Sequence, residues 1–348
     1  MRRRHSICGC LLMSAPTDRN QWLDLVQEDI IDPERMICDP HHHLWDHDRN
    51  AYLLPELLAD IGQGHNVVST VFVECGSMYN ARADQTMAPV GETEFVNGIA
   101  AMSASNQYGP AKVCAGIVSY ADLTLGDSVG PVLDAHMAAS SRFRGIRHAA
   151  GWDGSLAVRN SHTDPSEHLF LDETFQQGFT QLEKRGLSFD AWLYHPQISE
   201  LTALAQAFPK VTIIFDHFGG PLGIGPYAGK REEIFAQWQK DVTQLALCPN
   251  VVAKLGGIVM PINGFGLHKG EQPPSSDAIV AATGRYHDFA IEVFGPERCM
   301  FESNFPVDKQ SCSYHVLWNA FKKIAKKHTQ ADQQWLFHDT ASRVYRLN

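Results

Sequence analysis

The feature that most constrains the fold of this chain is a regular alternation of short apolar runs with longer helical stretches. The runs are rich in β-branched and aromatic residues, which favour strands. Eight such runs occur, at 36–43, 67–75, 112–119, 142–148, 187–194, 211–217, 250–256 and 298–303. Helical patterns occur at 92–107, 129–140, 173–185, 198–207, 230–247, 276–294 and 313–327. Strands that alternate with helices predict a parallel sheet, because a parallel connection needs a crossover element.

Eight strands in this rhythm predict the α/β class and a single-domain (β/α)8 barrel, also called a TIM barrel. An open doubly wound sheet is the alternative, but such sheets usually have fewer strands. A chain of 348 residues fits one barrel, and no interdomain linker interrupts the alternation. We expect an N-terminal extension over residues 1–35 and the barrel over residues 36–348.

The composition argues against several kinds of partner. The chain has 29 Lys and Arg against 39 Asp and Glu, a formal net charge of −10. We therefore expect no binding of nucleic acid or of an anionic membrane surface. No apolar run reaches the roughly 18 residues that span a bilayer. Four cysteines, Cys38, Cys75, Cys114 and Cys299, lie in or beside predicted strands, which favours buried reduced thiols and a cytoplasmic location.

The first residues, MRRRHSICGCLLM, combine basic residues with a short apolar segment, as a signal peptide does. Gly9 interrupts that segment, so both a weak signal peptide and a true start at Met13 remain open. The close pair Cys8 and Cys10 lacks the two-residue spacer of redox and zinc motifs.

Polar residues stand at the carboxyl end of every predicted strand. In chain order they are His41 and His43, Glu74, Tyr120, Arg147 and His148, His195, Asp216 and His217, Lys254, and Glu302 with Asn304. Active sites of TIM barrels form at these ends, and buried strands rarely end in charged groups without a reason. We predict a site here, with a mouth formed by loops 219–229 and 256–275. Lys254 and Glu302 give the weakest signal, because structural salt bridges would explain them equally well.

Three consecutive histidines occur in the stretch DPHHHLWD. Side chains of a strand alternate between its two faces, so His41 and His43 point one way and His42 the other. Two imidazoles on one face suit metal binding or proton transfer.

The motifs DPHHHLWD, FRGIRH, IIFDHFGGP and RCMFESNFPVD together resemble the amidohydrolase-2 branch of the amidohydrolase superfamily. The resemblance extends from about residue 36 to the end, including a closing helix in LFHDTASRVYRL. It implies a hydrolase that opens a lactone or cyclic ester of a small, carboxylate-bearing organic acid with activated water. The alternatives are a metal-dependent decarboxylase of the same fold and a barrel that binds a ligand without catalysis.

The resemblance also implies roles for individual residues. His41, His43 and His217 are implied as catalytic residues and, where a divalent zinc-like ion is bound, as its ligands, whereas His42 is expected to be structural. Arg147 is implied to bind a carboxylate or the lactone oxygen, since a guanidinium can hold a carboxylate through two parallel hydrogen bonds. The other expected substrate contacts are His148, Tyr120, Glu74 and His195. Some family members work without metal, so metal binding stays open; no organic cofactor is expected, and a homo-oligomer remains open.

Asn304 departs from the family pattern. The strand-eight motif usually reads S-D-W-P, and its aspartate activates water; here Asn304 stands at that position. An amide does not ionise and cannot accept the proton of water. In one interpretation a neighbouring carboxylate is the base, with candidates Glu302, Asp308 and Glu74. In a second, a histidine is the base while Asn304 orients water or substrate, with candidates His217 and His195. In a third, the barrel only binds a ligand.

Overall fold

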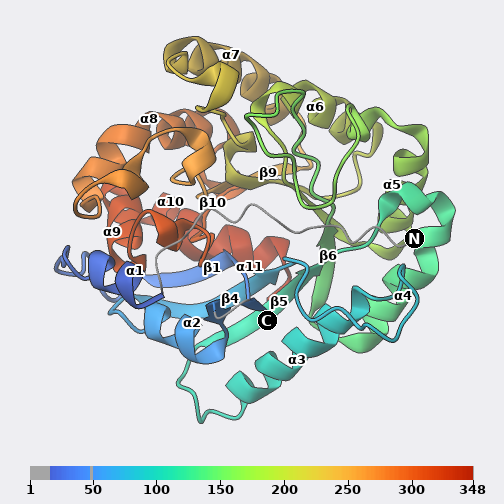
Figure 1. The fold of residues 1–348 in the computed structure, drawn as a ribbon, viewed down its shortest axis with the longest axis horizontal. Helices are drawn as coiled ribbons and strands as arrows, with labels where there is room; N and C mark the ends of the chain where they lie inside the picture. The colour runs from blue at the N-terminus through green and yellow to red at the C-terminus, as the bar shows by residue number, and fades with distance from the viewer. Residues whose placement is uncertain (1–15, 48–49, 348) are drawn as a thin grey trace, which may run out of the picture.

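The computed structural model describes residues 16–47 and 50–347. Eight parallel strands form one sheet in the order β1-β4-β5-β6-β7-β8-β9-β10, and helices surround them on the outside (Figure 1). The strands are β1 (Met36–His42), β4 (Asn66–Val73), β5 (Lys112–Ser119), β6 (Phe143–Arg147), β7 (Ser188–Ala191), β8 (Ile213–Phe215), β9 (Val251–Leu255) and β10 (Cys299–Phe301). The predicted barrel is confirmed, and several strands end two or three residues earlier than predicted.

All of the predicted helices are present. They are α3 (Val90–Ala104), α4 (Gly130–Ala139), α5 (Glu173–Arg185), α6 (Ile198–Ala207), α7 (Arg231–Ala246), α8 (Ser276–Phe294) and α9 (Tyr314–Ala325). The sequence did not predict the hairpin of β2 (Trp45–His47) with β3 (Asn50–Tyr52), or α2 (Leu54–Ile61). Short helices α1 (Pro16–Leu23), α10 (Gln330–Gln334) and α11 (Thr340–Val344) lie near the two ends of the described chain. No helix of the described residues is long and apolar enough to cross a membrane.

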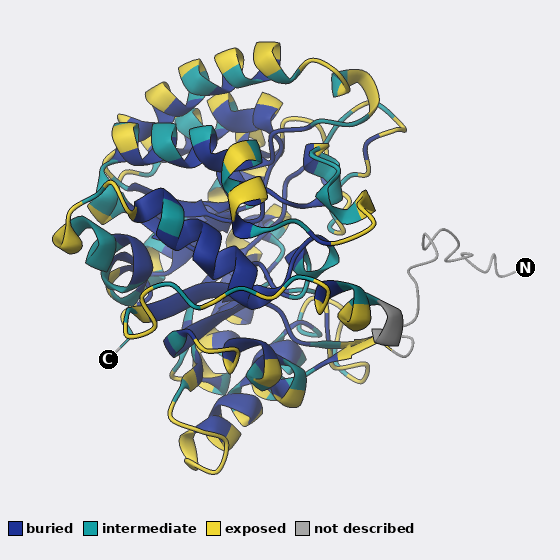
Figure 2. Cartoon of the chain, turned by 90° about the vertical axis from the view of Figure 1, so that its left-hand side faces the viewer, coloured by how far each residue is buried: buried dark blue, intermediate teal, exposed yellow. Residues whose placement is uncertain are grey.

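Helix α5 illustrates why these segments form helices that pack on the sheet. Its N-terminus is capped by Asp172, whose carboxylate accepts a hydrogen bond from the Phe175 amide at 2.8 Å. Phe175 and Phe179 are one turn apart, so both face the sheet and contact Phe189 of β7. The helix stops at Gly186, which adopts φ 62°, a conformation that glycine adopts without strain. Figure 2 shows the resulting pattern, with buried strands and exposed outer faces of the helices.

Backbone hydrogen bonds just beyond β10 nearly close the barrel. The Asn304 amide donates to the His41 carbonyl at 2.9 Å, and the His43 amide donates to the Phe305 carbonyl at 2.8 Å. These two bonds join the end of β1 to the segment after β10. Closure therefore places the histidine run next to the segment that contains Asn304.

The carboxyl-terminal segment packs against residues inside the barrel. Val344 and Tyr345 contact a cluster of interior side chains that includes Val71, Ile214 and Met300. Helix α11 accordingly lies in the middle of the ring of helices in Figure 1. Two apolar layers result, one between sheet and helices and a smaller one inside the barrel.

The predicted free thiols agree with the structure within the described residues. Cys38, Cys114 and Cys299 are buried, Cys75 is half-buried, and none of the four forms a disulfide. The signal-like start, Met13, Cys8 and Cys10 lie outside the described residues. The boundary between an extension over 1–35 and the barrel stays a prediction.

Candidate active site

Three buried side chains from distant parts of the chain meet at the carboxyl ends of the strands. His41 is on β1, His217 follows β8 and Glu302 follows β10. His41 Nδ1 lies 2.7 Å from Glu302 Oε2, and His217 Nδ1 lies 2.6 Å from Glu302 Oε1. Their potential ligand atoms all lie within 4.8 Å of one another. Glu302 therefore bridges two imidazoles at the centre of the site.

The contact between His41 and Glu302 is short but is not a hydrogen bond. Glu302 Oε2 is buried and has no hydrogen-bond partner among the described residues, although His41 Nδ1 is 2.7 Å away. The two atoms are therefore not directed along a common donor–acceptor line. His41 Nδ1 is instead within hydrogen-bonding distance of the Lys254 ammonium, at 3.4 Å.

Lys254 lies beneath this group with two aspartates. Its ammonium is 2.6 Å from Asp190 Oδ2, 3.5 Å from Asp216 Oδ1 and 3.4 Å from His41 Nδ1. Burial disfavours the charged ammonium, but Asp190, Asp216 and Glu302 outweigh burial and raise the pKa of Lys254. Burial, together with the nearby Lys254 cation, lowers the pKa of His41 well below its usual value. His41 is therefore a neutral imidazole.

Arg147 forms a second buried ion pair beside the histidines. Its Nε donates to Glu74 Oε1 at 2.7 Å, and its Nη2 donates to the Glu74 carbonyl at 2.6 Å. Its Nη1 lies 3.4 Å from His41 Nε2. His162, from the long loop after β6, reaches the other carboxylate oxygen of Glu74 at 3.0 Å. Burial alone would raise the pKa of Glu74, but Arg147 and His162 overcome it and hold that pKa well below its usual range.

The buried charges of the site do not balance. Four carboxylates, Glu74, Asp190, Asp216 and Glu302, face two permanent cations, Arg147 and Lys254. Burial raises the pKa of Glu302 to about 8 and that of Asp216 to about 7. Neither oxygen of Asp216 has a hydrogen-bond partner among the described residues. Buried negative charge is costly, so the site requires either bound protons or an added cation.

The donor set of His41, His217 and Glu302 fits a divalent ion. Two imidazoles and one carboxylate with a further open position make up a familiar zinc set. A divalent cation would also compensate the surplus of negative charge described above. The Lys254 ammonium beside His41 repels such an ion, so we expect its binding to be weaker than at a site without that cation.

His43 lies next to this group but outside it. Its ring centroid is 4.9 Å from that of His41, and its Nδ1 donates to the Val73 carbonyl at 2.8 Å. This bond fixes the tautomer and leaves Nε2 as an acceptor. The predicted ligand set of His41, His43 and His217 thus differs from the observed group by one member, because Glu302 takes the place of His43. Burial lowers the pKa of His42 to about 4, and its Nε2 lies 2.9 Å from Thr70 Oγ1, away from the site.

The other predicted residues lie around the central group. His148 Nδ1 accepts a hydrogen bond from the Leu123 amide at 3.3 Å, and its ring packs on Tyr120. His195 Nδ1 accepts from the Leu222 amide at 3.2 Å, within the loops after β7 and β8. Both histidines therefore hold loop backbone, and neither forms a hydrogen bond with the central histidines.

The side chain of Asn304 points towards the carboxyl group of Asp308. Its Nδ2 donates to Asp308 Oδ1 at 3.0 Å, and both side chains are buried. Its backbone adopts φ 55°, a left-handed conformation that asparagine tolerates better than most residues.

Sequence reasoning missed two members of the site and underrated two more. Asp190 lies inside the run LSFDAWLY, where an interior charge was not expected, and His162 lies in a loop without any periodic signal. Lys254 and Glu302 gave the weakest signal among the polar strand ends, yet both lie at the centre of the site. Their positions near the ends of β9 and β10, in line with the polar ends of the other strands, were the sequence signal that connected them to the site.

Two consecutive glycines after β9 make room for the central side chains. A Cβ on Gly257 would lie 2.2 Å from His217 Nδ1, and a Cβ on Gly256 would lie 2.4 Å from Glu302 Cγ. Gly257 also has φ +68°, which disfavours any other residue. The approach of His217 to Glu302 therefore depends on the absence of side chains at both positions.

Comparison with known proteins agrees with this architecture. The family of proteins described as amidohydrolases matches residues 38–347. The protein y4mH of Sinorhizobium fredii is 35% identical over 340 residues, which are 89% of this chain and 98% of that protein. An L-fucono-1,5-lactonase of Burkholderia multivorans is 25% identical over 204 residues, 57% of this chain and 66% of the lactonase. The crystal structure of an amidohydrolase from Burkholderia multivorans with bound zinc has a TM-score of 0.67 at 22% identity, and covers 90% of this chain and 100% of that chain. With a family match that extends over nearly the whole barrel, this chain belongs to the amidohydrolase family.

Proposed function

We propose that this amidohydrolase opens a lactone, or a similar cyclic ester of a small organic acid, with water activated beside Glu302. The observation that carries the proposal is the bridge of Glu302 between His41 and His217. The lactonase among the relatives supports the same class of reaction. Of the three interpretations of Asn304, this is the one in which a neighbouring carboxylate is the base.

Glu302 is better placed for this role than the other carboxylates considered. Glu74 is held by Arg147 and His162, and Asp308 accepts the hydrogen bond of Asn304. The raised pKa of Glu302, about 8, makes its ionised form a strong base close to neutral pH. In the proposed reaction, this ionised form takes a proton from water as the oxygen attacks the ester carbonyl carbon. The ring C–O bond then breaks, and the proton passes from Glu302 to the departing oxygen. The product is the open hydroxy acid.

Two cations support the developing negative charge. Arg147 places Nη1 3.4 Å from His41 Nε2, so its positive charge lies beside the reacting groups and can stabilise a substrate carboxylate or the oxyanion. Lys254 is fully buried and acts indirectly, because it contacts His41 and neutralises the charge of Asp190 and Asp216. A zinc-like ion held by His41, His217 and Glu302 would supply Lewis-acid polarisation of the ester carbonyl when bound.

The reaction can be tested with a panel of sugar-acid and dicarboxylate lactones, with the acid released on hydrolysis measured in a pH-stat. Steady release of acid supports the proposal; CO₂ release would indicate a decarboxylase, and tight binding without turnover a ligand-binding barrel. Glu302→Gln is expected to lower kcat/KM about 100-fold or more, the scale of losing a general base. Glu232→Gln is the matched control and should keep most activity, because Glu232 is an exposed residue paired with Arg285 at 2.8 Å.

Metal binding has a readout that does not depend on activity. Protein loaded with cobalt(II) is expected to show visible absorption bands at about one ion per chain, and His217→Asn should abolish them. Bands that persist in this variant would place the ion elsewhere.

A further inference from the structure

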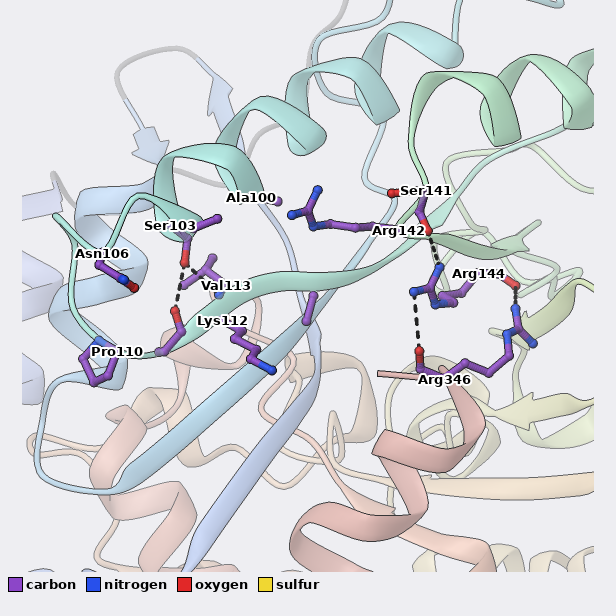
Figure 3. Close-up of a pocket in the computed structure, with 13 residues that line it drawn as sticks. Ala100, Ser103, Asn106, Pro110, Lys112, Val113, Ser141, Arg142, Arg144 and Arg346 are labelled. Carbon is purple, nitrogen blue, oxygen red and sulfur yellow. Dashed lines mark hydrogen bonds between the residues drawn. The ribbon is translucent and has the colours of Figure 1, made fainter. Parts of the chain in front are cut away.

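Figure 3 shows a pocket where strands β5 and β6 begin. It has a volume of about 490 Å³ and is lined by the start of β5, the start of β6, the end of α3 and Arg346. Strands β5 and β6 begin here, whereas the catalytic side chains stand where the strands end. The pocket is therefore separate from the proposed active site.

Four cations and no carboxylate line this pocket. The cations are Lys112, Arg142, Arg144 and Arg346. None of them forms an ion pair with a carboxylate of the described residues, whereas Arg185, Arg285, Lys309 and Lys323 each do. Within the described residues, four cations thus gather without an ion-pair partner in a chain whose net charge is −10.

The hydrogen bonds of these arginines orient the guanidiniums without neutralising them. Arg142 Nη1 donates to the Asn97 amide oxygen at 3.2 Å, and Arg346 Nη2 donates to the Arg144 carbonyl at 3.1 Å. Arg144 Nη1 donates to the Ser141 carbonyl at 2.7 Å. All of these acceptors are neutral. Burial, and then repulsion from Arg346 and Arg142, lowers the pKa of Arg144.

We propose that this pocket binds a small multivalent anion that carries phosphate groups or several carboxylates. Planar guanidiniums match the oxygen geometry of both groups, and a bound anion would relieve the repulsion among the cations. The volume lies within the range of small-molecule sites. Ala100 and Pro110 add an apolar wall that can cover the carbon skeleton of an organic anion.

Titration calorimetry of the full chain, dialysed against EDTA, tests the site with two probes, pyrophosphate and citrate. We expect one anion per chain, with affinity that falls at least tenfold as salt rises, since exposed charge interactions are screened. Preference for pyrophosphate would identify a phosphorylated ligand, and preference for citrate an oligocarboxylate. Failure of both probes to bind would overturn the proposal.

The double variant Arg142→Gln with Arg346→Gln locates the binding. It is expected to bind the preferred probe about 100-fold more weakly, as two charge-assisted contacts are lost. Arg285→Gln is the matched control, because Arg285 is a surface arginine paired with Glu232 at 2.8 Å, and it should bind normally. Circular dichroism and thermal unfolding check that each variant is folded. Full binding by the folded double variant would place the anion elsewhere, for example beside Arg147, and would refute the site.

Discussion

The side chain of Asn304 donates a hydrogen bond from Nδ2 to Oδ1 of Asp308 at 3.0 Å, and both side chains are buried. The amide is therefore matched to an acid rather than left free to orient water. A carboxylate at position 304 would face Asp308 across the same distance, and two buried like charges cannot both ionise at low cost. Substitution at Asn304 must be judged together with Asp308.

Asn304→Asp is expected to reduce the free energy of unfolding by about 2–4 kcal/mol at neutral pH, because it places two buried carboxyl groups in contact. The exchange Asn304→Asp with Asp308→Asn keeps one acid and one amide, so it should recover most of that loss. Urea unfolding of the two variants measures the difference. Equal stability of the single variant and the native protein would contradict this account of the pair.

His42 provides a second test at the scale of one residue. His42→Ala removes the buried contact with Thr70 and should lower the free energy of unfolding by about 1–3 kcal/mol, with kcat/KM of the folded protein changed little. His41→Ala is the matched comparison and should lower kcat/KM about 100-fold. Activity assays beside urea titrations separate the two effects. The reverse pattern would mean that the histidine run faces the other way.

At the scale of the element, the end of β9 combines the buried cation Lys254 with two positions that must lack a side chain. Lys254 faces the barrel interior, and Gly256 and Gly257 follow directly after the strand. Without a Cβ, the chain can turn away from the strand while His217 and Glu302 occupy the adjacent space. The end of this strand thus contributes the charged side chain of Lys254 and leaves space for the side chains of His217 and Glu302.

Gly257→Ala should therefore displace His217 and lower kcat/KM by about tenfold or more, the scale of a small misplacement of a reacting group. Gly229→Ala is the matched control: Gly229 has φ +77° but nothing lies within 4 Å of its added Cβ, so it tests the backbone strain alone. If both variants lose stability while only Gly257→Ala loses activity, the clash is the cause. Equal activity in both would exclude it.

At the scale of the whole molecule, the carboxyl-terminal segment reaches the catalytic cluster through the inside of the barrel. The Tyr345 hydroxyl donates to Asp190 Oδ2 at 2.6 Å, and the same oxygen accepts a hydrogen bond from Lys254. Arg144 at the opposite face donates to the Tyr345 carbonyl. The segment therefore connects the two ends of the barrel and fixes the aspartate that positions Lys254.

Buried neutral histidines contribute to the loss of stability of the fold in acid. Burial lowers the pKa of His136 and of His287 from 6.5 to about 4. The unfolded chain therefore binds protons more readily than the folded one below about pH 6.5, so stability present above that pH is lost as the pH falls towards 4. Each group is expected to cost about 2 kcal/mol between pH 7.5 and pH 5.

The substitution His287→Phe tests the direction of this pH dependence. A phenyl ring suits the position because the imidazole already packs against Phe218, Phe301 and Phe321. The variant should show a shallower loss of stability in urea titrations between pH 7.5 and pH 5. Arg285→Gln, two residues away on the exposed face of α8, is the control and should keep the native slope. A steeper loss in His287→Phe would contradict the assignment of a neutral buried imidazole.

The sequence by itself determined the class of fold and the edge of the barrel at which the polar residues gather. Strand and helix patterns depend on periods of two and 3.6 residues, which are local properties of the chain. Polar residues at the ends of parallel strands necessarily meet at one edge. For this reason the eight strands, the principal helices and the positions of His41 and His217 could be predicted from the sequence.

Only the tertiary structure decided which of those residues touch. Whether Lys254 forms a remote salt bridge or lies beside His41 depends on barrel closure, and the pairing of Glu302 with two histidines joins β1, β8 and β10. His162 enters from a loop whose path no periodic pattern encodes. Contacts across a closed barrel are set by the register and tilt of all the strands together, and by the space left by glycines, so the partners of a buried charge cannot be read from the residues next to it in the chain.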